Sequence, residues 1–250
     1  MTKRVLVLGG TGEARELAAR LAGRSGLEVV SSLAGRTSEP RRPPGRTRVG
    51  GFGGPDGLAS WLAAEGIEAV VDATHPFATA ITEAAVTATS RLGVPLLVLR
   101  RPGWTAGPGD DWRRVPSLAA AAANLPGQRV LLTVGRGEVR AFAADQDRWF
   151  LIRSVEVPEP PLPPRAQVVT ARGPFTVADE LVLMRGHGID VVVTRDSGGT
   201  QTAAKLTAAR ELGRPVVMVD RPPAPAAPTV ATVTDAVAWL ERSGPTAVGR

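Results

Sequence analysis

The chain of 250 residues has no cysteine, no tyrosine, two histidines and only two lysines, Lys3 and Lys205. Without cysteine there is no disulfide, no thiolate nucleophile and no cysteine-bound metal. His75 and His187 are too few for a histidine-rich site, so we expect no bound metal. No apolar run approaches the roughly 18 residues that span a membrane, and the first apolar run reaches a glycine turn too early for a signal peptide. These absences predict a cytoplasmic protein with no membrane partner.

Aromatic residues are also scarce, at 4% of the chain, whereas 30 Lys and Arg stand against 24 Asp and Glu. The resulting net charge of +6 suggests an anionic partner, which could be nucleic acid, a phosphorylated cofactor or a polycarboxylate. The excess is spread over both halves of the chain, and few rings are available to stack on bases. We therefore expect no nucleic-acid partner and look for a small anionic ligand.

Nearly continuous Val and Leu runs alternate with amphipathic stretches along the chain. Such runs are typical of parallel strands that are buried on both faces of a sheet. They lie at 4–8, 27–33, 69–72 and 95–99, and then at 129–134, 149–153, 167–171, 190–194 and 215–220. Helical patterns lie at 13–24, 77–92, 175–185 and 200–212. The pattern predicts two doubly wound α/β domains, residues 1–102 and 103–250, with a hinge in the loosely patterned stretch 100–126.

The first apolar run ends in a glycine turn, Gly9-Gly10-Thr11-Gly12-Glu13, and a helical pattern follows. Glycines let the backbone approach a pyrophosphate closely, and the helix N-terminus presents N–H groups to an anion. Two of the glycines fit the start of G-x-G-x-x-G, but Arg15 stands at the third glycine position. The turn predicts a dinucleotide site, with a ligand-free βα turn as the alternative.

The loop after the second strand contains Ser32, Arg36 and Thr37 and no acidic residue before Glu39. Folds that bind NAD usually place a carboxylate here for the ribose 2′-hydroxyl, whereas NADP requires arginine or small polar residues for its 2′-phosphate. Five arginines lie at positions 36–48 against that one glutamate. The stretch favours a phosphate-bearing cofactor, with a solvated basic loop as the alternative.

Asp72, Thr74 and His75 follow the third strand, and Pro76 begins the next helix. Ligands of an open α/β sheet lie at this carboxyl edge. A histidine there can donate to a substrate carboxylate or transfer a proton, and it can equally cap a helix or brace a loop.

A second glycine turn, Asp196-Ser197-Gly198-Gly199-Thr200, precedes the helical pattern that contains Lys205. It predicts a second anion cradle. Lys205 stands out among the arginines because an ammonium group can lose its proton when desolvated, which a guanidinium cannot; an exposed helix cation is the alternative. Arg136 and Arg172 also follow strands, where arginines can grip the carboxylates of one large ligand.

These motifs together resemble the precorrin-6A reductase family, which includes the cobalt-precorrin-6A reductases. The resemblance rests on Gly9-Gly-Thr-Gly-Glu-Ala14, Asp72-Ala-Thr-His-Pro-Phe-Ala78, Gly173-Pro-Phe175, Asp196-Ser-Gly-Gly199 with Lys205, and Arg221-Pro222. It departs at Arg195, where lysine is expected in many relatives. The resemblance implies two Rossmann-like domains with the active site in the cleft between them. It further implies NADPH-dependent reduction of one double bond in the tetrapyrrole precorrin-6A, giving precorrin-6B in cobalamin biosynthesis.

On this interpretation NADPH contacts the first glycine turn together with Ser32, Arg36, Thr37 and Thr74. The polycarboxylate tetrapyrrole contacts His75, Arg136, Arg172, Ser197, Gly198, Gly199 and Thr200. The proton is expected to come from Asp196 or Lys205 through water, or from solvent, and His75 is a further candidate catalytic residue. Neighbouring enzymes of the same pathway are candidate partners. Two alternative functions stay open: another NADP-dependent reductase on the same scaffold, and a non-catalytic NADP-sensing regulator. The sequence does not distinguish a cobalt-free from a cobalt-containing substrate.

Overall fold

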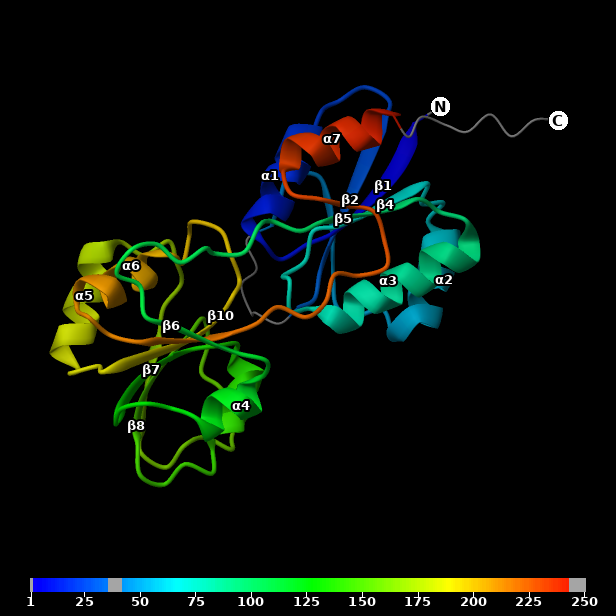
Figure 1. Cartoon of the computed structure of the whole chain (residues 1–250). Helices are drawn as coiled ribbons and strands as arrows, with labels where there is room; N and C mark the ends of the chain where they lie inside the picture. Colours follow the sequence, from blue (N-terminus) through cyan, green and yellow to red (C-terminus); the bar gives the residue numbers. More distant parts are fainter. Residues whose placement is uncertain (1, 36–41, 243–250) are drawn as a thin grey trace. The chain divides into compact units, whose positions relative to one another are not determined.

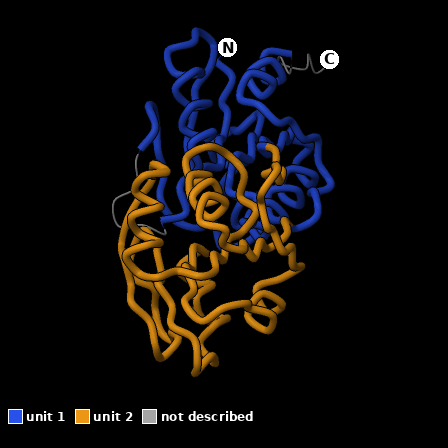
Figure 2. The backbone as a smooth tube through the Cα atoms, turned by 60° about the vertical axis from the view of Figure 1, so that its left-hand side comes forward, with its two compact units in different colours: residues 1–101, 222–250 blue, residues 102–221 orange. Residues whose placement is uncertain are grey.

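The chain forms two compact units in the computed structural model, which describes residues 2–35 and 42–242 (Figures 1 and 2). Unit 1 contains the residues up to Arg101 and those from Pro222 onward, whereas unit 2 is Pro102–Arg221. The expectation that 103–250 form one domain was therefore wrong for the C-terminal segment. The segment returns to unit 1 because one of its strands pairs there and its helix packs on the first helix.

Unit 1 is a parallel sheet in the order β12-β5-β4-β1-β2-β3. The strands are β1 (Lys3–Leu8), β2 (Leu27–Leu33), β3 (Arg46–Val49), β4 (Ala69–Asp72), β5 (Leu96–Leu99) and β12 (Thr229–Val230). The helices are α1 (Gly12–Leu21), α2 (Gly54–Ala64), α3 (Thr79–Leu92) and α7 (Val233–Arg242). The strand order changes direction between β1 and β4, which is where an open α/β sheet binds its ligands.

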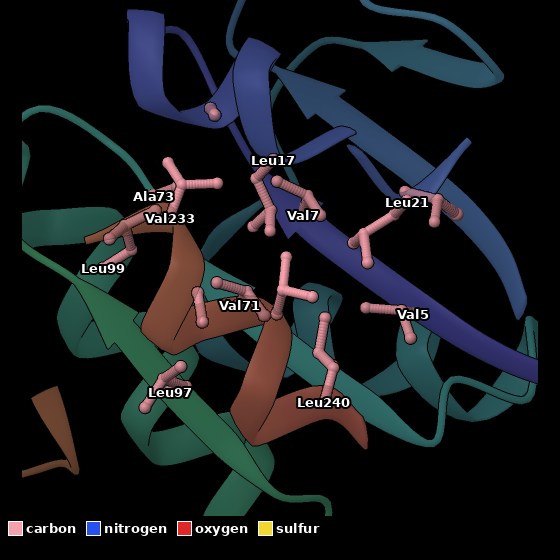
Figure 3. Packing of buried hydrophobic residues seen from close by; sticks show 14 of the residues in the cluster. Val5, Val7, Leu17, Leu21, Val71, Ala73, Leu97, Leu99, Val233 and Leu240 are labelled. Atoms are coloured by element: carbon pink, nitrogen blue, oxygen red, sulfur yellow. The ribbon is translucent and has the colours of Figure 1, made fainter. Parts of the chain in front are cut away.

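Both faces of this sheet are covered, which explains the unbroken apolar runs of its central strands. On β1, Val5 and Val7 pack against α1 and α7, as Figure 3 shows. Leu6 and Leu8 point to the opposite face and pack against α2 and α3. Because successive side chains of a strand alternate between faces, burial on both sides requires every position to be apolar.

Unit 2 is a second parallel sheet, in the order β6-β11-β10-β7-β8-β9. The strands are β6 (Trp112–Val115), β7 (Arg129–Thr133), β8 (Trp149–Ser154), β9 (Ala166–Thr170), β10 (Val191–Arg195) and β11 (Val216–Val219). The helices are α4 (Leu118–Ala123), α5 (Val177–Gly186), α6 (Ala204–Glu211) and the 3₁₀ helix η1 (Arg136–Phe142). The two parallel-sheet α/β units that the sequence predicted are thus confirmed.

One edge strand of each sheet pairs with a strand that is distant from it in sequence. β6 follows β5 in sequence but pairs with β11, and β12 follows β11 but pairs with β5. The chain therefore passes between the units twice. The predicted hinge at 100–126 was wrong in part, since it contains β6 and α4. Edge strand β6 escaped detection because Arg113 and Arg114 interrupt its apolar pattern.

Candidate functional site

The glycine turn after β1 lies at the switch point of the unit 1 sheet, beside the end of β4. Thr11 caps α1, because its hydroxyl oxygen accepts from the Ala14 N–H at 3.1 Å. The same hydroxyl donates to the Ala73 carbonyl at 2.7 Å and so ties the start of α1 to the residue after β4. The N–H groups of the first helical turn have no intrahelical acceptor and carry the positive end of the helix dipole. The turn can therefore receive an anion.

Gly10 provides the open side of this turn. Its φ is +115°, a conformation that L side chains rarely adopt, and a β-carbon built on it meets no atom within 4 Å. A phosphate group can thus approach the backbone directly. Glu13 would repel such a group, but its carboxylate forms an ion pair with Arg101 at 2.6 Å. The pair neutralises the only acidic side chain in the first turn of α1.

Ser32 is the second-last residue of β2 and lies on the other side of the turn, with only 5% of its surface exposed. Its hydroxyl accepts a hydrogen bond from the Arg48 guanidinium at 3.1 Å. Arg36 and Thr37, which were predicted to contact the cofactor, lie outside the described residues. Arg48 was counted among the five arginines of the basic stretch but was not singled out, because sequence alone does not show that it pairs with Ser32.

A pocket of about 230 Å³ opens at the carboxyl ends of β4 and β5. Its lining includes Thr74, His75, Thr82, Glu83, Arg100 and the segment Pro222–Pro225. Asp72 is 1% exposed and accepts hydrogen bonds from the backbone and hydroxyl of Thr74 and from the hydroxyl of Thr82. Its carboxylate therefore fixes the loop that carries Thr74 and His75 and orients the start of α3.

The ring of His75 is oriented by its own loop. Its Nδ1 accepts a hydrogen bond from the Phe77 N–H at 3.3 Å, and the two rings lie 5.8 Å apart. In the neutral ring the hydrogen is then on Nε2. Of the predicted site residues of unit 1, the structure thus brings Thr11, Glu13 and Thr74 together in one depression, with His75 in the adjoining pocket.

Asp196, a predicted proton donor in unit 2, is enclosed by other groups. It is 4% exposed, and its two carboxylate oxygens accept from the Trp104 N–H and from Arg114, each at 3.0 Å. Arg221 lies 3.7 Å away and donates to the Asp196 carbonyl at 2.7 Å. This arrangement favours a structural role, in which Asp196 fastens the segment after Pro102 to the end of β10.

The glycine pair after Asp196 also serves packing. A β-carbon on Gly198 would lie 2.1 Å from the Pro102 carbonyl oxygen, and the Gly199 carbonyl accepts from the Trp104 indole at 2.9 Å. Helix α6 begins only at Ala204. The expectation that the glycines open directly into a helix N-terminus was wrong, because a turn that closes around Trp104 separates the two.

Lys205 lies in the first turn of α6 and is 2% exposed. Its Nζ donates to the Thr202 carbonyl at 2.6 Å and lies 4.7 Å from the centre of the Trp104 ring. The pKa of Lys205 is lowered from 10.5 to about 7, mainly by burial and also by the positive charges of Arg153 and Arg195, while Glu180 acts in the opposite direction. The alternative of an exposed helix cation is therefore wrong. Trp104, which the sequence did not single out, is the residue that covers Lys205.

The predicted arginines of unit 2 have different surroundings. Arg136 forms an ion pair with Glu156 at 2.6 Å, and Arg172 is exposed. Arg195, at the end of β10, pairs with Glu138 at 2.8 Å. The second oxygen of Glu138 accepts from the Gly135 N–H at 2.7 Å, so a carboxylate of the protein itself occupies the anion-binding turn after β7.

The described part of the chain offers neither a metal-binding cluster nor a membrane-spanning helix. No three His, Asp or Glu side chains within residues 2–35 and 42–242 form a group that could hold a metal ion. None of the helices in those ranges is both long and apolar enough to cross a membrane.

Comparison with known proteins gives one consistent result. Residues 4–241 match the family described as Precorrin-6x reductase CbiJ/CobK. A Precorrin-6A reductase of Rhodococcus erythropolis is 56% identical over 240 residues, covering 95% of this chain and 97% of its own. One of Rhodobacter capsulatus is 48% identical over 249 residues, covering 98% and 99%. A solved structure of CobK precorrin-6A reductase is 47% identical and covers 100% of both chains with a TM-score of 0.92.

Proposed function

The chain belongs to the precorrin-6x reductase family CbiJ/CobK, and we propose that it reduces precorrin-6A to precorrin-6B with NADPH in cobalamin biosynthesis. The relatives that support this substrate align with the chain over almost their whole length. They are named precorrin-6A reductases, and their names do not mention cobalt. We therefore propose the cobalt-free macrocycle as the substrate. In the reaction one double bond of the macrocycle gains a hydride at one ring carbon and a proton at its neighbour.

The observation that carries the cofactor proposal is the open turn at Gly10, where a β-carbon would meet nothing and a phosphate group can approach the backbone. The residues of unit 1 fit a dinucleotide that crosses this turn. Ser32 and Arg48 would meet the adenosine half on the β2 side, and the pocket beside His75 would receive the other half on the β4 side. When bound, NADPH supplies the hydride.

The chain's own residues then have three tasks. Thr11 and Asp72 hold the loops after β1 and β4 in place, which fixes where the ligand can lie. Arg136 and Arg172 supply positive charge for the carboxylates of the substrate. Of the three candidate proton carriers, His75 lines a pocket, whereas the carboxylate of Asp196 accepts from Trp104 and Arg114 and Lys205 is buried.

The proposed reaction predicts that purified protein oxidises one NADPH for each precorrin-6A consumed. The absorbance of NADPH should fall at the same rate as the macrocycle spectrum changes, because one hydride transfer oxidises the cofactor and reduces the macrocycle. Cobalt-precorrin-6A serves as the comparison substrate and should react more slowly. Tight NADPH binding without oxidation would indicate a sensor, and oxidation only with an unrelated alkene or carbonyl would indicate another reductase.

Gly10→Ala is expected to lower NADPH affinity by about tenfold to a hundredfold, because its β-carbon would occupy the space that the phosphate requires. A titration of NADPH fluorescence measures this effect without substrate. Gly23→Ala is the matched control, since Gly23 has a φ of +75° and equally open surroundings but follows the other end of α1. An equal loss of affinity in both variants would contradict a phosphate site at Gly10 and indicate backbone strain instead.

A further inference from the structure

Arg48 lies where the second strand of the unit 1 sheet meets the third. Ser32 of β2 and Arg48 of β3 are register partners near the carboxyl ends of these strands, and the Arg48 Nη1 donates to the Ser32 hydroxyl. In a dinucleotide-binding sheet of this order, the residue that ends the second strand faces the ribose of the adenosine half. The pair therefore lies where an NAD-binding fold would place its carboxylate.

The surroundings of Arg48 are neutral. Its Nη1 also donates to the Gly50 carbonyl at 2.8 Å and its Nη2 to the Gly51 carbonyl at 3.0 Å. Among the residues that the structure describes, no carboxylate pairs with it. Arg46, two residues earlier on the same strand, differs in this respect because it binds Glu65 through two bonds of 2.7 and 3.0 Å.

The Arg48 guanidinium is also held rigidly. Its central carbon lies 3.8 Å from the centre of the Phe52 ring, and Phe52 in turn packs edge-on against Trp61. Burial lowers the pKa of Arg48, and within 2–35 and 42–242 no acidic group offsets this effect. A guanidinium has five N–H donors, of which the described contacts use three. Contacts within the described residues thus leave two donors for a ligand, on an ordered cation that no described carboxylate neutralises.

We infer that Arg48, supported by Ser32 and Phe52, binds the 2′-phosphate of NADPH and selects this cofactor over NADH. The inference rests on the proposed function, and it names the residue that distinguishes the two cofactors. A phosphate would supply the missing negative charge and accept two parallel bonds from the planar guanidinium. Because Phe52 and the glycine carbonyls already fix the side chain, little conformational entropy is lost on binding.

Arg48→Met tests this inference with two nucleotide fragments, 2′,5′-ADP and 5′-AMP, whose binding is measured by calorimetry without substrate. The variant is expected to lose about tenfold to a hundredfold in affinity for 2′,5′-ADP, the effect of losing hydrogen bonds to a charged group. Its affinity for 5′-AMP should stay within about twofold, since that fragment lacks the 2′-phosphate. Arg46→Met is the matched control and should leave both affinities unchanged because Glu65 already neutralises Arg46.

Arg48→Lys is the second variant, in case loss of the cation unfolds the loop after β3. It retains the charge without the planar pair of donors and should show an intermediate loss for 2′,5′-ADP. An unchanged preference for 2′,5′-ADP in both Arg48 variants would overturn the inference, as would a loss of that preference in Arg36→Met alone. If the unaltered protein does not prefer 2′,5′-ADP to 5′-AMP, the proposed use of NADPH fails as well.

Discussion

The free energy of unfolding of unit 2 is expected to rise by about 4 kcal/mol between pH 7 and pH 10.5 because of Lys205 alone. The pKa of this side chain is lowered from 10.5 to about 7, first by burial and then by Arg153. Between these two values the unfolded chain holds a proton that the folded chain has released, so stability increases with pH. Below pH 7 both states are protonated, and the contribution stays at its unfavourable limit.

Few other groups of this chain titrate in that interval, since it has no cysteine, no tyrosine and one other lysine. Urea unfolding at several pH values, followed by the fluorescence of the five tryptophans, measures how the free energy of unfolding changes with pH. Lys205→Met should flatten this slope while retaining most of the side-chain volume. Lys3→Met is the control and should preserve most of the slope, although burial also lowers the pKa of Lys3. If the free energy of unfolding rose equally with pH in the original protein and in Lys205→Met, Lys205 would not be the buried lysine with a lowered pKa.

Asp196→Ala is expected to destabilise unit 2 by about 1 to 3 kcal/mol, which is typical of leaving a buried hydrogen-bonding group without its partner. The change leaves the Trp104 N–H without an acceptor and leaves Arg114 and Arg221 without their shared buried carboxylate. Thermal or urea unfolding measures the loss. The bonds from Arg221 to the Pro102 carbonyl and from the Trp104 indole to the Gly199 carbonyl stay in place in this variant.

Asp220→Ala provides a matched control, because Asp220 pairs with the same Arg114 at 2.7 Å from an exposed position. A solvent-exposed pair contributes little, so this variant should lose no more than about 1 kcal/mol. Similar losses in the two variants would show that Asp196 does not hold the buried junction. A stable Asp196→Ala protein that binds NADPH normally but no longer reduces substrate would instead support its predicted role as a proton donor.

The sequence by itself determined the local structure of the sheets. The predicted runs at 27–33 and 69–72 are strands β2 and β4 without any shift, because burial on both faces favours apolar residues at most positions of a strand. The glycine turn before α1 was equally readable. Thr11 is a strong N-cap residue, and only glycine readily adopts the positive φ of Gly10. The family followed from the order of these local motifs.

Only the tertiary structure decided which sheet receives β6 and β12, since short edge strands carry too little apolar pattern to specify a partner. It likewise showed that Asp196 is locked by Trp104, 92 residues away in the sequence, and that Lys205 is buried beneath the same ring. Arg48 became notable only in the tertiary structure, where it bonds to Ser32 and no described carboxylate pairs with it. The periodicity of a sequence reports which face of an element is buried, whereas the charge and solvation of a side chain depend on groups that folding brings from distant positions.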